Sequence, residues 1–110
     1  MATVLVFIES ENGKVRAVGR EACSAAKIVA KGLSADVVAV NLGKPADDAA
    51  SLGNLGVKKI IQAGGGELDN YSTEGWTQAA AEIIKAENPA AVFFPATLRG
   101  KDLAPRVAAR

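Results

Sequence analysis

The sequence predicts an α/β fold in which a mainly parallel sheet lies between two layers of helices. Two observations lead to this prediction. Four short apolar runs, rich in β-branched or aromatic residues, have the length of strands and are almost continuously hydrophobic, as is typical of strands covered on both faces. The segments between them carry apolar residues at the three- and four-residue spacing of helices. This alternation favours parallel strands joined by right-handed crossovers.

The predicted strands occupy residues 3–8, 36–42, 57–63 and 91–96. Asn12-Gly13 is a strong turn signal between the first strand and the first helix. Gly32 suits the C-terminal end of that helix. The apolar positions that predict the helix are Val15, Val18, Ala22, Ala25, Ala26 and Val29.

A short second helix is expected over residues 45–52, with Pro45 near its first turn and Gly53 and Gly56 after it. Its acidic pair Asp47-Asp48 would lie in the first turn, where the helix dipole favours carboxylates. That placement explains the pair without a Mg²⁺ site or acid–base chemistry.

The third helix is predicted from a stripe of apolar residues that begins at Trp76, which we interpret as a core residue. Ser72 or Thr73 suits its N-cap, and Asn88-Pro89 ends it because proline removes a backbone donor. The rest of the stripe is Ala79, Ala80, Ile83 and Ile84.

A fourth helix is predicted to begin near Gly100 or Lys101 and to be still running at Arg110. Domains rarely end inside a helix. We therefore expect residues 1–110 to be the N-terminal α/β domain of a longer protein, with the last helix truncated.

Composition excludes several classes of function. The formal charge of +1 and the lack of long single-sign runs give no electrostatic reason to expect nucleic acid or an anionic membrane as partner. No apolar run approaches the length that spans a membrane, and no secretory signal pattern opens the chain. With a single cysteine, the chain is expected in a reducing compartment. The bacterial cytoplasm is preferred, and the mitochondrial matrix is the alternative.

Catalytic and metal sites are not expected either. The chain has one cysteine and no histidine, which excludes an internal disulfide and a His/Cys metal site. Cys23 lies among alanines on the first predicted helix, where a packing role is expected. The run Gly64-Gly65-Gly66 lacks the spacing of a phosphate loop and is interpreted as a surface loop. No constellation is suited to covalent or acid–base catalysis.

One crevice could bind a ligand. Open parallel sheets bind ligands beyond the carboxyl ends of the strands, where the strand order reverses. If the first strand lies beside the fourth, in the order 3-2-1-4, that crevice is flanked by Glu9-Ser10 and by residues 97–100. Thr97, Gly100 and Lys101 have the character of an anion site at a helix start. The alternative is that these residues, with Asp102 favoured by the helix dipole, serve the fold or a protein interface.

Three segments of the sequence are distinctive: VLVFIE with ENGKV, NLG…LGNLGVKKIIQA, and the most specific, AAVFFPATLRGKDLAPRVAAR. In these segments the chain resembles the N-terminal domain of the α subunit of electron-transfer flavoproteins, and the last segment is similar to the family motif A-T-x-x-G-[RK]-D-L-A-P-R-x-A-A-R. The matching positions comprise the crevice candidates Thr97, Gly100 and Lys101 and the structural or interface residues Asp102, Leu103, Pro105 and Arg106.

The resemblance implies a Rossmann-like fold of the adenine-nucleotide α-hydrolase kind. It also implies an α/β heterodimer that carries electrons from flavin dehydrogenases, such as the acyl-CoA dehydrogenases of fatty acid β-oxidation, to a quinone oxidoreductase. The FAD would be held mainly by a C-terminal flavin domain that residues 1–110 lack, and not by this domain alone. This domain would pack on the β subunit and act as part of an electron carrier, not as an enzyme.

Two other classes of protein share the alternating pattern. A stand-alone adenine-nucleotide-binding module of the stress-protein or pyrophosphatase-like class would need a glycine-rich phosphate loop near the fourth strand, where only Gly100 is available. A flavodoxin-like FMN carrier would need a hydroxyl- and glycine-rich loop after the first strand. That position carries Glu9-Ser10-Glu11, which would repel phosphate.

Overall fold

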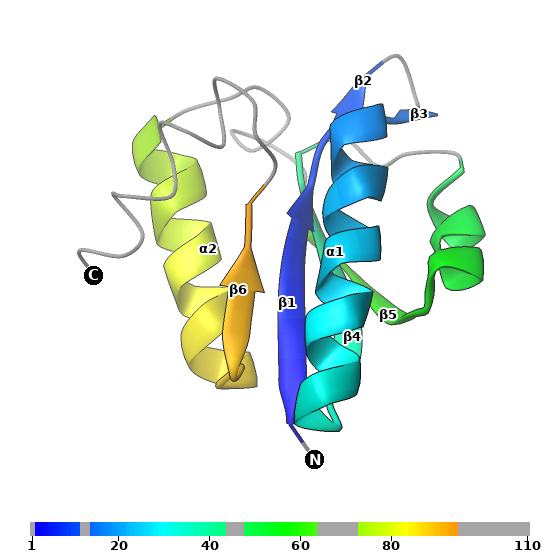
Figure 1. The fold of residues 1–110 in the computed structure, drawn as a ribbon. Helices are drawn as coiled ribbons and strands as arrows, with labels where there is room; N and C mark the ends of the chain where they lie inside the picture. Colours follow the sequence, from blue (N-terminus) through cyan, green and yellow to red (C-terminus); the bar gives the residue numbers. More distant parts are fainter. Residues whose placement is uncertain (1, 12–13, 44–47, 64–72, 95–110) are drawn as a thin grey trace.

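A four-stranded parallel sheet forms the centre of the chain (Figure 1). The computed structural model describes residues 2–11, 14–43, 48–63 and 73–94. The strands lie in the order β5-β4-β1-β6, so the first strand of the sheet lies between the second and the fourth along the chain. This confirms the order 3-2-1-4. The strands are β1 (Thr3–Ile8), β4 (Asp36–Leu42), β5 (Val57–Ala63) and β6 (Ala91–Phe93).

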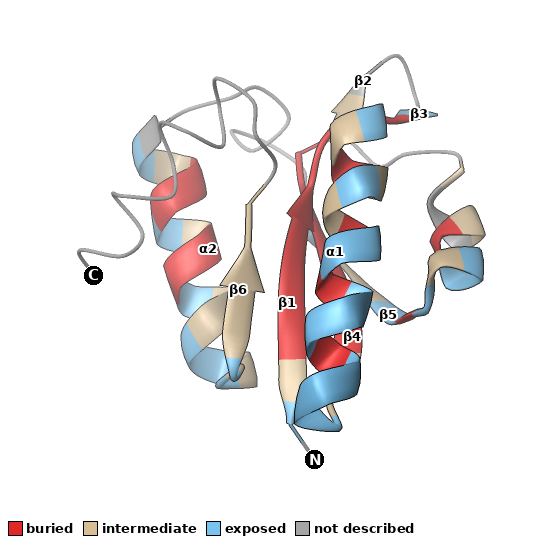
Figure 2. Cartoon of the chain, in the orientation of Figure 1, coloured by how far each residue is buried: buried red, intermediate tan, exposed pale blue. Residues whose placement is uncertain are grey.

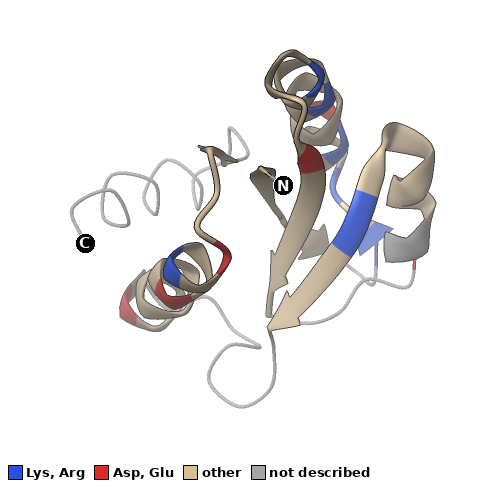
Figure 3. Ribbon diagram, turned by 90° about the horizontal axis from the view of Figure 1, so that it is seen from below, with Lys and Arg blue, Asp and Glu red and all other residues tan. Residues whose placement is uncertain are grey.

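Helices α1 (Ala17–Leu33) and α2 (Thr73–Glu87) cover opposite faces of this sheet, which confirms the three-layer prediction (Figure 3). Because side chains alternate along a strand, β1 supplies both layers of core. Val4, Val6 and Ile8 pack toward α1, and Leu5 and Phe7 pack toward α2. All five are almost completely buried, and β1 is the buried centre of the domain (Figure 2).

The α1 layer comes close to β1 at Gly19. A Cβ atom on Gly19 would stand 3.3 Å from Cβ of Ile8, which is tighter than an ordinary van der Waals contact. The missing side chain therefore lets the first turn of α1 approach the carboxyl end of β1. The α1 residues buried in this layer with Gly19 are Cys23, Ala26 and Ala30.

A small hairpin lies between β1 and α1, where the sequence predicts only a turn and a helix. Strand β2 (Ser10–Glu11) pairs with β3 (Lys14–Val15) in antiparallel fashion. Val15 is therefore a strand residue, and its assignment to the helical stripe is wrong. Its side chain is still buried against the α1 layer, because the spacing that suggests a helix also suits this core position. Asn12-Gly13 lies outside the described residues.

Gly32 lies in the last turn of α1, as predicted, and the left-handed residue after the helix is Ser34 at φ 53°. The N–H of Ala35 then donates to the carbonyl of Ala30 at 2.9 Å, which satisfies a carbonyl of the last turn. This closure outweighs the small cost of a left-handed serine, about 1–2 kcal/mol.

The second helical segment is a 3₁₀ helix, η1 (Ala49–Leu55), and not an α-helix over residues 45–52. It runs through Gly53 to Leu55 and is followed by Gly56, whose φ of 87° is a left-handed conformation that favours glycine. Leu52 is fully buried against the α1 layer and anchors the segment. Pro45 lies outside the described residues.

Helix α2 agrees with the prediction in its apolar stripe and at its C-terminal end. It begins at Thr73, so Thr73 lies within the helix and is not its N-cap. Trp76 is 4 % exposed and packs in the core, and the helix ends before Asn88, whose φ is 46°. The N–H of Ala90 then donates to the carbonyl of Thr3 at 2.8 Å and aligns the chain with β1. Strand β6 ends at Phe93, earlier than predicted, and residues 95–96 and Ser72 lie outside the described residues.

Candidate functional site

The strand order reverses between β1 and β6, and this is where an open parallel sheet presents its ligand crevice. The connections that leave β1 toward β4 and β5 run on the α1 face. The connection from β5 back to β6 runs through α2 on the other face. The connections at the carboxyl ends of β1 and β6 therefore diverge, and a ligand crevice is expected between these two strand ends.

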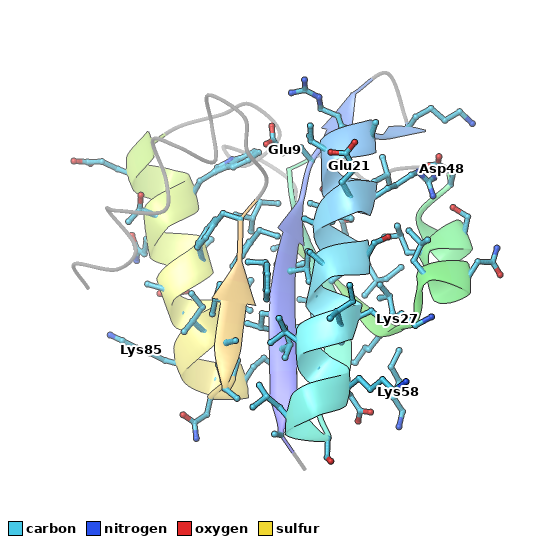
Figure 4. All side chains as sticks on the ribbon, viewed as in Figure 1. Glu9, Glu21, Lys27, Asp48, Lys58 and Lys85 are labelled. Carbon is cyan, nitrogen blue, oxygen red and sulfur yellow. The ribbon has the colours of Figure 1, made fainter. Side chains whose placement is uncertain are left out.

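Glu9 directly follows β1 at this edge of the sheet (Figure 4). Glu9 is only 4 % exposed, and its Oε1 lies 3.7 Å from Nη1 of Arg16. The N–H of Arg16 also donates to the carbonyl of Glu9 at 2.9 Å. These two links fix Glu9 to the start of α1. A carboxylate at this position raises the electrostatic cost of placing a phosphate beside it, and its ion pair with Arg16 offsets part of that cost.

The β6 side of the crevice is apolar. The rings of Phe7 and Phe94 stack with centroids 4.8 Å apart and planes inclined by 2°. Both residues belong to the α2 layer, where Trp76 is a further member. An aromatic stack contributes about 0.5–1.5 kcal/mol beyond its buried area, so this contact fastens the chain leaving β6 to β1.

A chain of hydrogen bonds ties together the carboxyl ends of β4 and β5. The Nδ2 of Asn41, a fully buried residue, donates to Oε1 of Gln62 at 2.9 Å. The Nε2 of Gln62 donates to the carbonyl of Gly43 at 2.8 Å, and the N–H of Gly43 donates to the carbonyl of Ala63. This link was not predicted from the sequence. The signal that could have found it is a single polar residue inside the apolar run DVVAVNL.

Asp48 holds the hairpin, α1 and η1 together. Its Oδ1 accepts from the N–H of Val15 at 2.8 Å, and its Oδ2 accepts from Nη2 of Arg20 at 2.6 Å. The residue stands at the N-cap of η1 but makes no side-chain cap there. The interpretation of Asp48 as a carboxylate explained by its own helix dipole is therefore wrong, because its partners are distant in sequence. Asp47 lies outside the described residues.

These contacts shift the titration of Asp48. The hydrogen bond from the Val15 N–H lowers the pKa of the carboxyl, and the Arg20 guanidinium lowers it further, while partial burial opposes both. The folded-state pKa of Asp48 therefore lies below its unfolded value of about 3.9. The ionised form is the one that the fold stabilises.

Replacing Asp48 with asparagine is expected to lower the thermal unfolding midpoint at pH 7. Because the folded-state pKa is depressed, the stabilising contribution is complete above about pH 4 and is lost as the pH falls through the folded-state pKa. The midpoints of wild type and variant, measured from pH 7 to pH 2, should therefore converge at the acid end.

Asp36→Asn is the control for this series, since Asp36 pairs with Lys58 only in an exposed contact of 3.5 Å and should change the midpoint much less at pH 7. Wild-type and Asp48→Asn curves that stay parallel down to pH 2 would contradict the assignment.

A comparison with known protein families shows the family of this chain. A profile of the electron transfer flavoprotein domain matches residues 4–110. The chain belongs to the electron transfer flavoprotein domain family. This confirms the resemblance that the sequence segments carry.

Curated relatives support the same family. Over 108 residues the chain is 33% identical to the electron transfer flavoprotein subunit alpha of Bacillus subtilis, covering 97% of this chain and 33% of the relative. It is 31% identical over 107 residues to protein FixB of Clostridium saccharobutylicum, covering 97% and 32%. It is 31% identical over 108 residues to the acryloyl-CoA reductase electron transfer subunit beta of Anaerotignum propionicum, covering 97% and 29%. The chain spans about one third of the length of these relatives.

In electron transfer flavoproteins and other flavin proteins, a pyrophosphate is held by backbone amides of a glycine-rich turn, by a helix N-terminus or by cations. The described residues beside the carboxyl ends of β1 and β6 are Glu9, which is ion-paired with Arg16, and the apolar stack of Phe7 on Phe94. The predicted site residues Thr97, Gly100, Lys101, Asp102, Leu103, Pro105 and Arg106 and the run Gly64-Gly65-Gly66 lie outside the described residues.

Reactive groups are scarce in the described part of the domain. Cys23 is fully buried, and burial raises the pKa of its thiol, although Arg20 opposes this effect. A buried, protonated thiol is a packing residue, which confirms the sequence-based interpretation. In the same residues no cluster of three or more His, Cys, Asp or Glu side chains could hold a metal ion, and no helix is long and apolar enough to cross a membrane.

Proposed function

We propose that residues 1–110 form the N-terminal domain of an electron transfer flavoprotein α-type subunit, and that this domain provides structure and subunit contacts in an electron carrier. The observation that carries the proposal is the family match over residues 4–110, together with relatives three of which are named as electron transfer subunits or FixB. These relatives are about three times as long, which supports a further domain in the complete protein.

In the complete protein, the FAD is held by the remainder of the α subunit together with a β subunit, and the domain described here does not bind it alone. The carboxylate of Glu9 supports this division, because it raises the cost of a phosphate at the expected crevice. Thr97, Gly100 and Lys101 follow β6 in the chain and would border the crevice, while Asp102, Leu103, Pro105 and Arg106 would serve the fold and the subunit interface.

The complex accepts electrons from flavin dehydrogenases, including those that act on acyl-CoA, and delivers them to a quinone oxidoreductase. The name of the Anaerotignum propionicum relative, which links that protein to acryloyl-CoA reductase, supports the acyl-CoA side of this proposal. The bacterial relatives support a cytoplasmic location.

Flavin absorbance tests the proposal. The purified chain of residues 1–110 is expected to show no flavin band near 450 nm after incubation with FAD and desalting, while the full-length subunit co-expressed with its β subunit should retain FAD. Stoichiometric FAD on the 110-residue chain, or no FAD on the co-expressed pair, would overturn it.

The alternative, a stand-alone adenine-nucleotide-binding module, finds no support among the relatives. Titration calorimetry of the chain with AMP and ATP separates the two functions. Silence is the expected result, and binding in the micromolar range would favour the alternative.

A further inference from the structure

The segment of residues 48–56, which consists of η1 with Asp48 before it and Gly56 after it, lies beside α1 and contacts it at both ends (Figure 4). At one end, Oδ2 of Asp48 accepts from Nη2 of Arg20 at 2.6 Å. At the other end, the side chain of Lys27 lies against Gly56, since a Cβ atom on Gly56 would stand 3.0 Å from Cδ of Lys27. We call residues 48–56 the strap.

Cys23 lies between the two points at which the strap contacts α1. Arg20, Cys23 and Lys27 follow one another at spacings of three and four residues, so they share one side of the helix. The thiol of Cys23 is fully buried, and Cys23 belongs to the same core cluster as Leu52, a fully buried residue in the middle of the strap. The strap therefore forms part of the cover over Cys23.

The strap is held more weakly than the strands that it joins. Two of its backbone hydrogen bonds close within it, from the N–H of Ser51 to the carbonyl of Asp48 and from the N–H of Gly56 to the carbonyl of Gly53. Neither bond belongs to the ladder that pairs β4 with β1 and β5. Bonds of the 3₁₀ type have poorer geometry than those of an α-helix, and segments outside the core open at lower free energy than core strands. Detachment of the strap would therefore leave the sheet paired.

We infer that the strap is a cooperative opening unit, whose two ends release from α1 together while the sheet stays folded, and that each opening exposes the thiol of Cys23. The same opening separates Oδ1 of Asp48 from the N–H of Val15, so that the β2–β3 hairpin loosens with the strap. That hairpin begins directly after Glu9, at the edge of the sheet where the ligand crevice is expected. The strap thus links the flank of α1 to this edge.

The rate at which Cys23 reacts with a maleimide tests this opening. The measurement uses the full-length chain, with any cysteine beyond residue 110 replaced by serine. The folded wild type is expected to react at least about a hundredfold more slowly than the urea-unfolded chain, because the buried thiol reacts only in the open state. Gly56→Ala is expected to accelerate the reaction at least about fivefold, because alanine is strained at a φ of 87° and opening relieves this strain.

Gly53→Ala is the matched control within the strap. A Cβ atom on Gly53 would meet no atom of another segment within 4 Å, and the φ of Gly53 is not left-handed. The reaction rate of Cys23 should therefore change by less than about twofold. Both glycine variants keep Arg20, whose charge acts on the pKa of the Cys23 thiol, so a difference between them reports access to the thiol and not its ionisation. Equal rates for the two variants would show that the strap does not cover Cys23 and would overturn the inference.

Phe7→Leu separates the opening of the strap from the unfolding of the core. Phe7 packs in the α2 layer, on the face of the sheet opposite to α1 and the strap. Its replacement should accelerate hydrogen exchange of the β1 amides and leave the reaction rate of Cys23 unchanged, because the strap opens without the core. A Cys23 rate that rises by the same factor as the β1 exchange would show that the thiol is reached only through unfolding of the core, which contradicts the inference.

Asp48→Asn tests whether the two ends of the strap open together. The substitution weakens the contact with Arg20 at one end, and hydrogen exchange of the Gly56 amide at the other end is expected to become at least about fivefold faster. Asp36→Asn, which removes the exposed pair with Lys58, is the control and should change this exchange by less than about twofold. An unchanged exchange rate of the Gly56 amide in Asp48→Asn would show that the ends open independently, and the strap would then not be a cooperative unit.

Discussion

Replacing Phe7 with alanine is expected to lower the free energy of unfolding of this domain by about 3–5 kcal/mol. Phe7 is 3 % exposed, lies on the central strand β1 and stacks on Phe94. The substitution removes the ring from the α2 layer and leaves a cavity next to Trp76. Since small domains are stable by only about 5–15 kcal/mol, this single change should bring the protein close to unfolding at room temperature.

Urea titration followed by far-ultraviolet circular dichroism measures this effect. Phe7→Leu is the control, because it retains much of the apolar volume and should cost roughly half as much. Phe94→Ala should lose the same stacking contact, and the double variant should cost less than the sum of the two single variants. A loss below about 1 kcal/mol for Phe7→Ala would contradict the packing of the α2 layer.

Replacing Leu52 with alanine is expected to cost about 2–5 kcal/mol, although the residue belongs to a short 3₁₀ segment. Leu52 is fully buried and anchors η1 to the α1 layer. Its loss should detach η1 from the α1 layer and weaken the contacts that Asp48 makes with Val15 and Arg20.

Chemical denaturation measures the total loss, and hydrogen exchange locates it. The expected pattern is faster exchange of the Val15 amide, because that amide is bound to Asp48. Ile28→Ala removes a comparable side chain that is 76 % exposed, and it should change the free energy of unfolding by less than about 0.5 kcal/mol. Equal effects of Leu52→Ala and Ile28→Ala would show that η1 is not anchored as described.

The strands could be predicted from the sequence because each is a nearly uninterrupted apolar run. The boundaries at 3–8, 36–42 and 57–63 agree with β1, β4 and β5. Trp76 and Cys23 were assigned to the core from their apolar neighbours at helical spacing, and both are buried. These features depend on local pattern, which a single sequence displays directly.

The features that were missed depend on contacts between distant residues. The β2–β3 hairpin places the Val15 N–H against the carboxylate of Asp48, 33 residues away in sequence. The left-handed residue after α1 is Ser34 and not a glycine, because the Ala35-to-Ala30 hydrogen bond closes the helix end. Neither contact leaves a trace in the apolar periodicity.

The candidate site was predictable in its location and only partly in its chemistry. The alternation of strands and helices predicts a parallel sheet, whereas the order that brings β1 beside β6 was assumed among the common orders of such sheets and agrees with the structure. The link from Asn41 through Gln62 to Gly43 joins side chains of different strands, so that it requires the register of β4 and β5. The segment from Thr97 to Arg106 stays a prediction.

The position of β1 at the centre of the sheet also governs the order of folding. It is the first strand to be synthesised, yet its pairing with β6 and the Phe7–Phe94 stack join the two ends of the described chain. Closing so long a loop costs entropy before the contacts form, and non-local pairings of this kind slow folding. On the ribosome, β1 can pair with β4 early. Until β6 and α2 have been synthesised, the edge of β1 that pairs with β6 and the face that carries Phe7 stay uncovered. During that interval the most hydrophobic strand of the domain is the segment that a chaperone would need to shield.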